Sequence, residues 1–135
     1  MLAPKALSSM LLNDQLPEYW LELASHDLKT CQILNKEKGP QDIIIYHYHQ
    51  CIEKILKSEI LRTSKNIPRI HDLERLFSCL NNPDLSNFVE PIIILNSIAL
   101  NIRYPQGDQI DANQYNMAKN AFTKLLEALA PQLLK

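Results

Sequence analysis

Glycine is nearly absent from this chain of 135 residues, which contains only Gly39 and Gly107. Average usage of about 7% would give roughly nine glycines in a chain of this length. Without clustered glycines there is no Gly-rich phosphate loop and no dinucleotide-binding turn of the G-x-G-x-x-G type. The chain also lacks the Asn-Gly and Asp-Gly pairs that favour tight β-hairpins. The composition therefore favours helices.

Clusters of proline, glycine and asparagine divide the chain into segments of helical length. The length suits one domain, and we find neither an internal repeat nor a low-complexity linker. We therefore predict a domain over residues 17–135, preceded by an N-terminal tail over residues 1–16. The breakers are Pro17, Gly39-Pro40, Ile67-Pro68, Asn81-Asn82-Pro83 and Pro105-Gln106-Gly107-Asp108.

Apolar residues recur at three- and four-residue steps in five segments, which is typical of α-helices with one buried face. Asp111 and Gln114 have the spacing of a capping box at the start of the last segment. Pro91 indicates that the fourth segment is kinked or begins later. The run 43–45 is β-branched and could open a strand, but the long stretch without a breaker favours helix. The segments span about 17–36, 41–63, 71–80, 85–102 and 111–129.

These segments, joined by short connections, predict an all-α fold, an antiparallel (up-and-down) bundle of about five helices. The run Ile92-Ile93-Ile94-Leu95 is apolar on every side of a helix. Such a helix is either central and covered on all sides, or it contributes to an interface with another chain.

Charge and cysteine content exclude several classes of protein. Fourteen Lys and Arg against fifteen Asp and Glu give a formal net charge of −1, so any contact with nucleic acid must be local. Three cysteines at no metal-like spacing predict reduced thiols in a cytoplasmic protein. The N-terminus makes a poor signal peptide, and no apolar run approaches the roughly 18 residues of a membrane helix. We therefore expect no membrane segment.

His47 and Cys51 are four residues apart and could share a metal ion on one helix face. His49 would point elsewhere, and no second pair of ligands is evident. We therefore interpret the three as partly buried helix residues, and expect no metal and no cofactor.

Six basic and three acidic residues between Lys54 and Arg75 give this stretch a net charge of 6 − 3 = +3. Solvated helix ends would explain it, and a patch for an anionic ligand or an acidic partner is the alternative. His71 lies between Arg69 and Arg75 and could contact a phosphate or a base. In the structural alternative, His71 bonds a neighbouring backbone group or Asp72 caps the following helix.

Arg103 and Tyr104 stand just beyond the apolar fourth segment. An arginine in the last turn of a helix interacts favourably with the free carbonyls there. The alternative function is a guanidinium that clamps a phosphate, with Tyr104 as a stacking surface.

Taken in order, four motifs resemble the HEPN domain (higher eukaryotes and prokaryotes nucleotide-binding), from about Tyr19 to Leu129. The most specific is the His-Gln-x-x-Glu-Lys-x-Leu-Lys string of the second segment. The motifs are Trp20-Leu-Glu-Leu-Ala24-Ser-His-Asp27-Leu28, Tyr48-His49-Gln50-Cys51-Ile52-Glu53-Lys54-Ile55-Leu56-Lys57, Ile70-His71-Asp72-Leu73 and Arg103-Tyr104-Pro105.

The resemblance implies a helical bundle, commonly a homodimer, and frequent pairing with a minimal nucleotidyltransferase in toxin–antitoxin pairs. The tail over residues 1–16 would then pack across the dimer or fray. Many family members are metal-independent ribonucleases in which four to six residues separate an arginine from the histidine that follows it. Here those positions hold Asp108, Gln109 and Ile110, and no histidine follows His71.

The chain thus resembles the Arg-Tyr-Pro branch of the family, in which binding is favoured over cleavage. The leading hypothesis is a non-catalytic dimer that binds a nucleotide or RNA phosphate, or a minimal nucleotidyltransferase, near Arg103, Tyr104 and His71. The alternative is a metal-independent ribonuclease toxin with a rearranged catalytic base. A third reading is a purely structural partner that neutralises or stabilises a nucleotidyltransferase.

Overall fold

The computed structural model describes residues 15–64, 66–102 and 109–135, which contain five α-helices, two short 3-10 helices and no β-strand. The predicted all-α bundle is confirmed. The elements are α2 (Pro17–Lys36), α3 (Gln41–Thr63), α4 (Leu73–Leu80), η2 (Pro83–Phe88), α5 (Val89–Ile102), α6 (Ala112–Leu129) and η3 (Pro131–Leu134).

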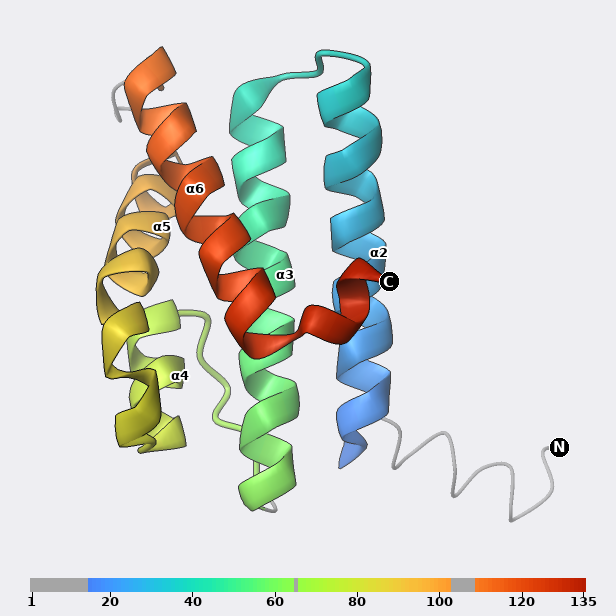
Figure 1. Cartoon of the computed structure of the whole chain (residues 1–135), viewed down its shortest axis with the longest axis vertical. Helices are drawn as coiled ribbons and strands as arrows, with labels where there is room; N and C mark the ends of the chain where they lie inside the picture. The colour runs from blue at the N-terminus through green and yellow to red at the C-terminus, as the bar shows by residue number, and fades with distance from the viewer. Residues whose placement is uncertain (1–14, 65, 103–108) are drawn as a thin grey trace, which may run out of the picture.

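Helix α3 is the centre of the bundle and contacts α2, α4, α5 and α6. Helices α2 and α3 form an antiparallel hairpin, α6 crosses in front of α3, and α4 and α5 lie on the side of α3 away from α2 (Figure 1). The chain direction reverses from each long helix to the next, as predicted for an up-and-down bundle. Residues 43–45 open α3 as helix, so the strand alternative does not occur.

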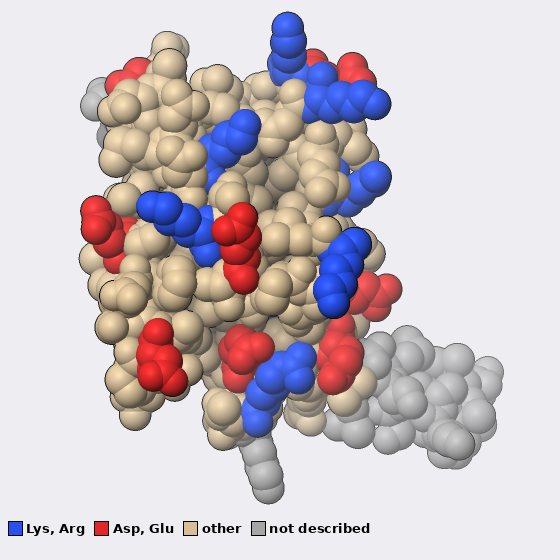
Figure 2. Space-filling model, viewed as in Figure 1, with Lys and Arg blue, Asp and Glu red and all other residues tan. Residues whose placement is uncertain are grey.

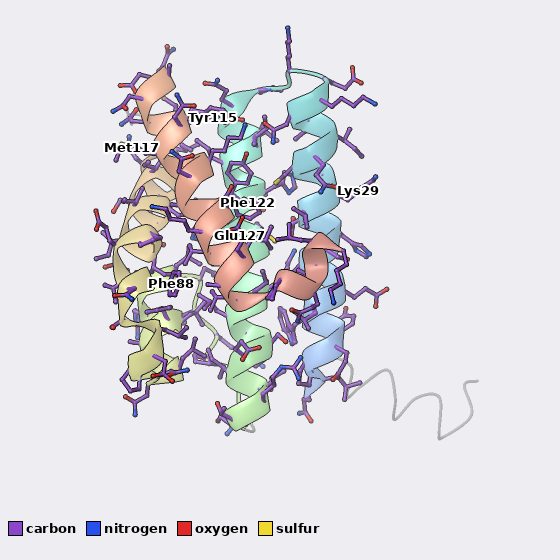
Figure 3. The ribbon with its side chains drawn as sticks, in the orientation of Figure 1. Lys29, Phe88, Tyr115, Met117, Phe122 and Glu127 are labelled. Atoms are coloured by element: carbon purple, nitrogen blue, oxygen red, sulfur yellow. The ribbon has the colours of Figure 1, made fainter. Side chains whose placement is uncertain are left out.

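The core is built from apolar side chains that α3 presents on most of its sides, among them the fully buried Ile45, Ile52 and Ile55. The Tyr48 ring stacks on the Phe122 ring of α6, with centroids 4.3 Å apart. Figure 3 shows Phe122 and Tyr115 along α6 where this helix crosses α3. This packing accounts for the position of α6 on the hairpin.

In the turn between α2 and α3, Gly39 does not adopt the left-handed backbone conformation that glycine often takes at the end of a helix. Lys38 takes the left-handed backbone conformation, with φ of 53°, while the Gly39 N–H donates to the Leu34 carbonyl over 2.7 Å. A Cβ atom on Gly39 would lie 3.0 Å from Leu34 Cδ2 and 3.3 Å from the Leu34 oxygen. A side chain at this position would therefore require Leu34 to shift by a few tenths of an ångström.

The fourth predicted segment is divided, because η2 precedes α5 and the α-helix begins only at Val89. Pro91 then falls in the first turn of α5, where its missing N–H costs no helical hydrogen bond. The later start that Pro91 indicated is thus confirmed. The capping box of α6 is also confirmed, since Asp111 Oδ1 accepts from the Gln114 N–H (2.7 Å) and Gln114 Oε1 accepts from the Asp111 N–H (3.1 Å).

Residues 83–102 form a helical stretch that is long and apolar enough to cross a membrane by length and composition, with a mean hydropathy of 1.4. Core helices meet the same criteria. Here the inner side of α5 is packed into the bundle, where Ile92, Leu95 and Ala99 are buried. Only 28% of the apolar window is buried inside the chain, so much of the outer side of this helix is uncovered.

Candidate functional site

A buried carboxylate on α2 joins the first two motifs. Asp27 Oδ1 lies 2.8 Å from His47 Nδ1, and Asp27 Oδ2 accepts a hydrogen bond from Lys54 Nζ over 2.5 Å. Both partners belong to α3, two helical turns apart. Asp27 therefore fixes the register of α2 against α3.

A second buried carboxylate joins the second and third motifs. Glu53, only 4% exposed, accepts hydrogen bonds at Oε2 from Lys57 Nζ (3.1 Å) and contacts His71 Nδ1 (3.0 Å). Its Oε1 atom is buried and has no hydrogen-bond partner among the described residues, with His49 Nδ1 3.9 Å away. A buried anion of this kind requires compensating charge, which Lys57 supplies.

The His71 side chain is 69% exposed although its partner Glu53 is buried. Because a carboxylate only accepts hydrogen bonds, the proton of this contact sits on Nδ1. In the neutral ring Nε2 is then the basic atom, and no hydrogen bond joins it to another described residue. The pair thus presents an oriented imidazole that can accept a proton or, once protonated, bind an anion.

Lys57 is held on two sides. Besides its hydrogen bond to Glu53, its ammonium lies over the Trp20 ring of α2, 5.3 Å from the centroid. Both contacts hold the ammonium group in place. Residues of all three described motifs, Trp20, Lys57 with Glu53, and His71, therefore meet in one cluster.

The buried Asn96 side chain of α5 anchors the segment that follows His71. Asn96 Oδ1 accepts from the Leu73 N–H (3.2 Å) and contacts His49 Nε2 (3.3 Å). Asn96 Nδ2 donates to Asp72 Oδ1 and to Glu74 Oε2, each over 3.2 Å. One amide therefore ties α3 and α5 to the start of α4.

The predicted cap of α4 is confirmed. Asp72 Oδ1 accepts from the N–H groups of Glu74 (2.9 Å) and Arg75 (3.2 Å). His71, in contrast, bonds the Glu53 side chain and not a neighbouring backbone group. The cap and the Glu53 contact together fix the loop that carries His71.

The structure brings only part of the predicted site together. Arg69 and Arg75 are exposed on either side of His71, and neither forms an ion pair with another described residue. His71 forms its hydrogen bond with Glu53 and not with either arginine. Arg103 and Tyr104 lie outside the described residues, so their predicted roles stay predictions. The N-terminal tail lies almost wholly outside them as well.

The predicted positive lobe between Lys54 and Arg75 is smaller than the formal charge suggested, because three of its cations are paired. Figure 2 shows acidic and basic side chains interspersed on the face in view. Ion pairs reduce the charge available to a ligand, which leaves Arg69 and Arg75 as the unpaired cations of the described part of this stretch. The pairs are Lys54 with Asp27, Lys57 with Glu53 and Arg62 with Glu59.

His47 and Cys51 do not converge on a common point, since His47 bonds Asp27 while Cys51 is fully buried in the core. Over residues 15–64, 66–102 and 109–135, no group of three or more His, Cys, Asp or Glu side chains is arranged to hold a metal ion. The three cysteines are free thiols, of which Cys31 and Cys51 are buried and Cys79 is exposed.

Sequence reasoning missed the roles of Glu53 and Asn96. Asn96 is a polar residue in the largely apolar run from Ile92 to Ala99, whereas Glu53 is followed directly by Lys54. Buried polar residues are uncommon and need hydrogen-bond partners. For Asn96 that signal was available in the sequence, but it does not name the partner.

Comparison with known proteins identifies a family for this chain. The HEPN domain family matches residues 17–132, which include all five α-helices and the Glu53–His71 pair. Neither a curated protein nor a solved structure matches the chain. Because the family match covers most of the sequence, the chain belongs to the HEPN domain family.

Proposed function

We propose that this HEPN domain binds the phosphate of a nucleotide or an RNA at the surface around His71 and does not cleave it. The observation that carries the proposal is the exposed His71 imidazole held through Nδ1 by the buried Glu53 carboxylate. A fixed ring with a free Nε2 loses little conformational freedom when it binds a ligand.

Two arginines lie close to His71 in the sequence. Arg69 precedes His71 in the same loop, and Arg75 lies in the first turn of α4. Both are exposed, and a guanidinium can bind two oxygens of one phosphate. In the proposal Arg103 is a further phosphate clamp and Tyr104 a stacking surface, and this part is supported by the sequence alone.

The family relationship supports two further parts of the proposal. The protein acts as a homodimer, and a minimal nucleotidyltransferase is its partner in a toxin–antitoxin-like pair. In a purely structural version of this proposal, the protein neutralises such a partner without binding phosphate.

A second candidate function is metal-independent RNA cleavage, which the Glu53–His71 pair favours specifically. A histidine oriented by a buried carboxylate is a common general base. His71 Nε2 would take the proton of a 2′-hydroxyl, the 2′-oxygen would attack the phosphorus, and the 5′-oxygen would leave and take up a proton. The products would be a 2′,3′-cyclic phosphate and a 5′-hydroxyl.

Isothermal titration with ATP and with a short single-stranded RNA tests the binding proposal. Each lost charge-assisted hydrogen bond is worth about 1.5–3 kcal/mol, so His71→Ala and Arg69→Ala should each weaken binding by about tenfold or more. His26→Ala, which removes an exposed histidine of α2, is the matched control and should bind as the wild type does.

The outcome separates the candidate functions. Wild-type protein that binds neither ligand at low salt refutes the phosphate-binding proposal. RNA that is cut in EDTA, with cleavage lost in His71→Ala and retained in His26→Ala, shows the ribonuclease instead. Co-purification with a nucleotidyltransferase, together with no phosphate binding, leaves the structural variant.

A further inference from the structure

The face of α3 that carries Glu53 changes from buried to exposed toward the start of the helix. Glu53 and Lys57, in the second half of α3, are 4% and 6% exposed. Tyr46 lies on the same face two turns before Glu53 and is 45% exposed. In Figure 1, α4 lies alongside the C-terminal half of α3, so it leaves the N-terminal half of this face open. An aromatic side chain is therefore accessible on the face of α3 against which His71 is held.

The Tyr46 ring is restrained by the residue that follows it. Its centroid lies 5.2 Å from that of the His47 ring, and the two ring planes are inclined at 81°. His47 is itself fixed, because its Nδ1 atom lies 2.8 Å from Asp27 Oδ1 of α2. A tyrosine held in this way loses little conformational freedom when a flat ligand stacks on it.

The Gln50 side chain lies between the aromatic ring and the buried carboxylate on this face. It is one turn from Tyr46 and one turn from Glu53, and it is partly exposed. Within the described part of the chain, the Gln50 amide has no hydrogen-bond partner. Since an amide both donates and accepts, it can bond a ribose hydroxyl or a phosphate oxygen.

We propose that the Tyr46 ring is the stacking surface for the base of a nucleotide whose phosphates bind at His71. The inference rests on the phosphate binding of the proposed function and adds the residue that contacts the base. At 1.5 Å per residue, Tyr46 and Glu53 are about 10.5 Å apart along α3. A nucleoside triphosphate spans such a distance between its base and its terminal phosphate, as do two successive nucleotides of single-stranded RNA. Every base has an aromatic face, so stacking of this kind accepts any of them.

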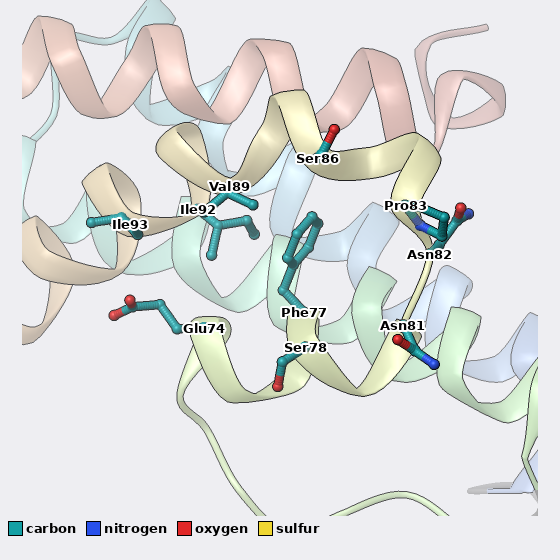
Figure 4. A pocket seen from close by; sticks show the side chains of 10 residues that line it. All are labelled: Glu74, Phe77, Ser78, Asn81, Asn82, Pro83, Ser86, Val89, Ile92 and Ile93. Carbon is teal, nitrogen blue, oxygen red and sulfur yellow. The ribbon is translucent and has the colours of Figure 1, made fainter.

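A groove on the far side of α4 is less suited to this ligand. It has a volume of about 540 Å³ and lies between α4 and the η2–α5 segment, and Figure 4 shows Phe77 and Ile92 pointing into it. Its described lining includes the Glu74 carboxylate and no basic residue, so a phosphate beside it would be repelled. Near Tyr46, in contrast, the buried carboxylates of α2 and α3 are each paired with a lysine.

Isothermal titration of the full chain with ATP and with inorganic tripolyphosphate, which has no base, tests the inference. Tyr46→Ala removes the stacking surface, so ATP should bind about 5- to 150-fold more weakly while tripolyphosphate binds as it does to the wild type. Tyr46→Phe keeps the ring and should bind ATP normally. Ile33→Ala, which truncates a side chain of α2 that is 52% exposed, is the matched control and should affect neither ligand.

Proton NMR of the adenine adds a readout that a merely structural role of Tyr46 would not move. The ring current of a stacked tyrosine shifts the adenine H2 and H8 signals upfield. We expect this shift with the wild type and with Tyr46→Phe, and its loss with Tyr46→Ala at saturating ATP. The same titrations with a short single-stranded RNA show whether the stacked base belongs to a free nucleotide or to a strand, because only a ligand that stacks is weakened by Tyr46→Ala.

Three results would overturn the inference and leave phosphate binding standing. The first is an affinity for ATP and RNA that Tyr46→Ala does not change, and the second is an equal weakening of ATP and tripolyphosphate. The third is an upfield shift that Tyr104→Ala removes and Tyr46→Ala does not. A wild type that binds neither ATP, RNA nor tripolyphosphate refutes the proposed function itself, and the inference falls with it.

Discussion

Glu53 Oε2 lies 3.0 Å from His71 Nδ1, which joins the middle of the central helix to a loop residue 18 positions further along the chain. The contact brings a buried anion and an exposed imidazole together. Because Lys57 shares the same carboxylate oxygen, the position of His71 depends on an ion pair inside the bundle. The surface proposed to bind phosphate is therefore coupled to the stability of the fold.

Glu53→Gln should strongly destabilise the protein. The change leaves the Lys57 ammonium buried without its anion, and breaking a buried pair costs about 3–5 kcal/mol. Urea denaturation followed by circular dichroism would measure the loss. Glu59→Gln is the control, because the Glu59–Arg62 pair is exposed and should be worth less than about 1 kcal/mol. Equal effects of the two changes would contradict a buried Glu53–Lys57 pair.

Asn96→Ala should loosen the start of α4. The substitution removes the acceptor of the Leu73 N–H and leaves buried polar groups unpaired, at a cost of about 1–3 kcal/mol or more. Hydrogen exchange should accelerate in residues 73–80 more than in α2. Asn101→Ala, on the exposed side of α5, should change neither the free energy of unfolding nor the hydrogen exchange of residues 73–80. Unchanged exchange in α4 would show that Asn96 does not anchor this helix.

Only one of the three cysteines should react rapidly with a thiol reagent in the native protein at pH 8. Burial raises the pKa of the Cys31 thiol from 9.0 to about 12, and it raises the pKa of Cys51 as well, so both stay protonated and enclosed. Cys79 is exposed. Titration with a chromogenic disulfide should give one fast thiol in wild type and none in Cys79→Ala, and two fast thiols would contradict the burial.

The free energy of unfolding should fall as the pH rises above about 9. Burial raises the native pKa of the Cys31 and Cys51 thiols, so between pH 9.0 and about 12 the unfolded chain has released protons that the native state retains. Each such group lowers stability by about 1.4 kcal/mol per pH unit. Below pH 9 both states are protonated and this contribution is constant.

Urea denaturation at pH 8, 9, 10 and 11 would measure this slope. Cys31→Ala should remove the contribution of one thiol and so reduce the slope by about 1.4 kcal/mol per pH unit. Cys79→Ala should leave it unchanged, because the exposed thiol belongs to no buried cluster. A slope that Cys31→Ala does not alter would exclude the Cys31 thiol as one of its causes.

The helices of this fold were largely readable from the sequence. The bounds of α2 and α3 agree with apolar periodicity and with the breakers at Pro17 and Gly39-Pro40. Helix periodicity and capping depend on residues that are close together in the sequence, so both can be recognised from the sequence alone. The division at Val89 was less evident, because a 3-10 turn and the first turn of an α-helix have similar sequence patterns.

The candidate site was predictable only in part. His71 could be singled out from its basic neighbours, and Asp72 from its capping position. Its partner Glu53 could not, because the contact depends on how the loop after α3 folds back over that helix. The positive lobe was overestimated for the same reason, since a charge count along the chain does not show that Lys54 pairs with Asp27 across a helix interface.

The hydrogen bonds of Asn96 also set an order of assembly during synthesis. The Leu73 N–H and the Asp72 carboxylate bond the Asn96 side chain, which follows them in the sequence by 23 and 24 residues and is therefore synthesised later. The α2–α3 hairpin can pack as soon as it has left the ribosome, since its contacts lie within one continuous stretch of chain. The loop with His71 acquires its final anchor only after α5 has emerged, so the site matures later than the hairpin that supports it.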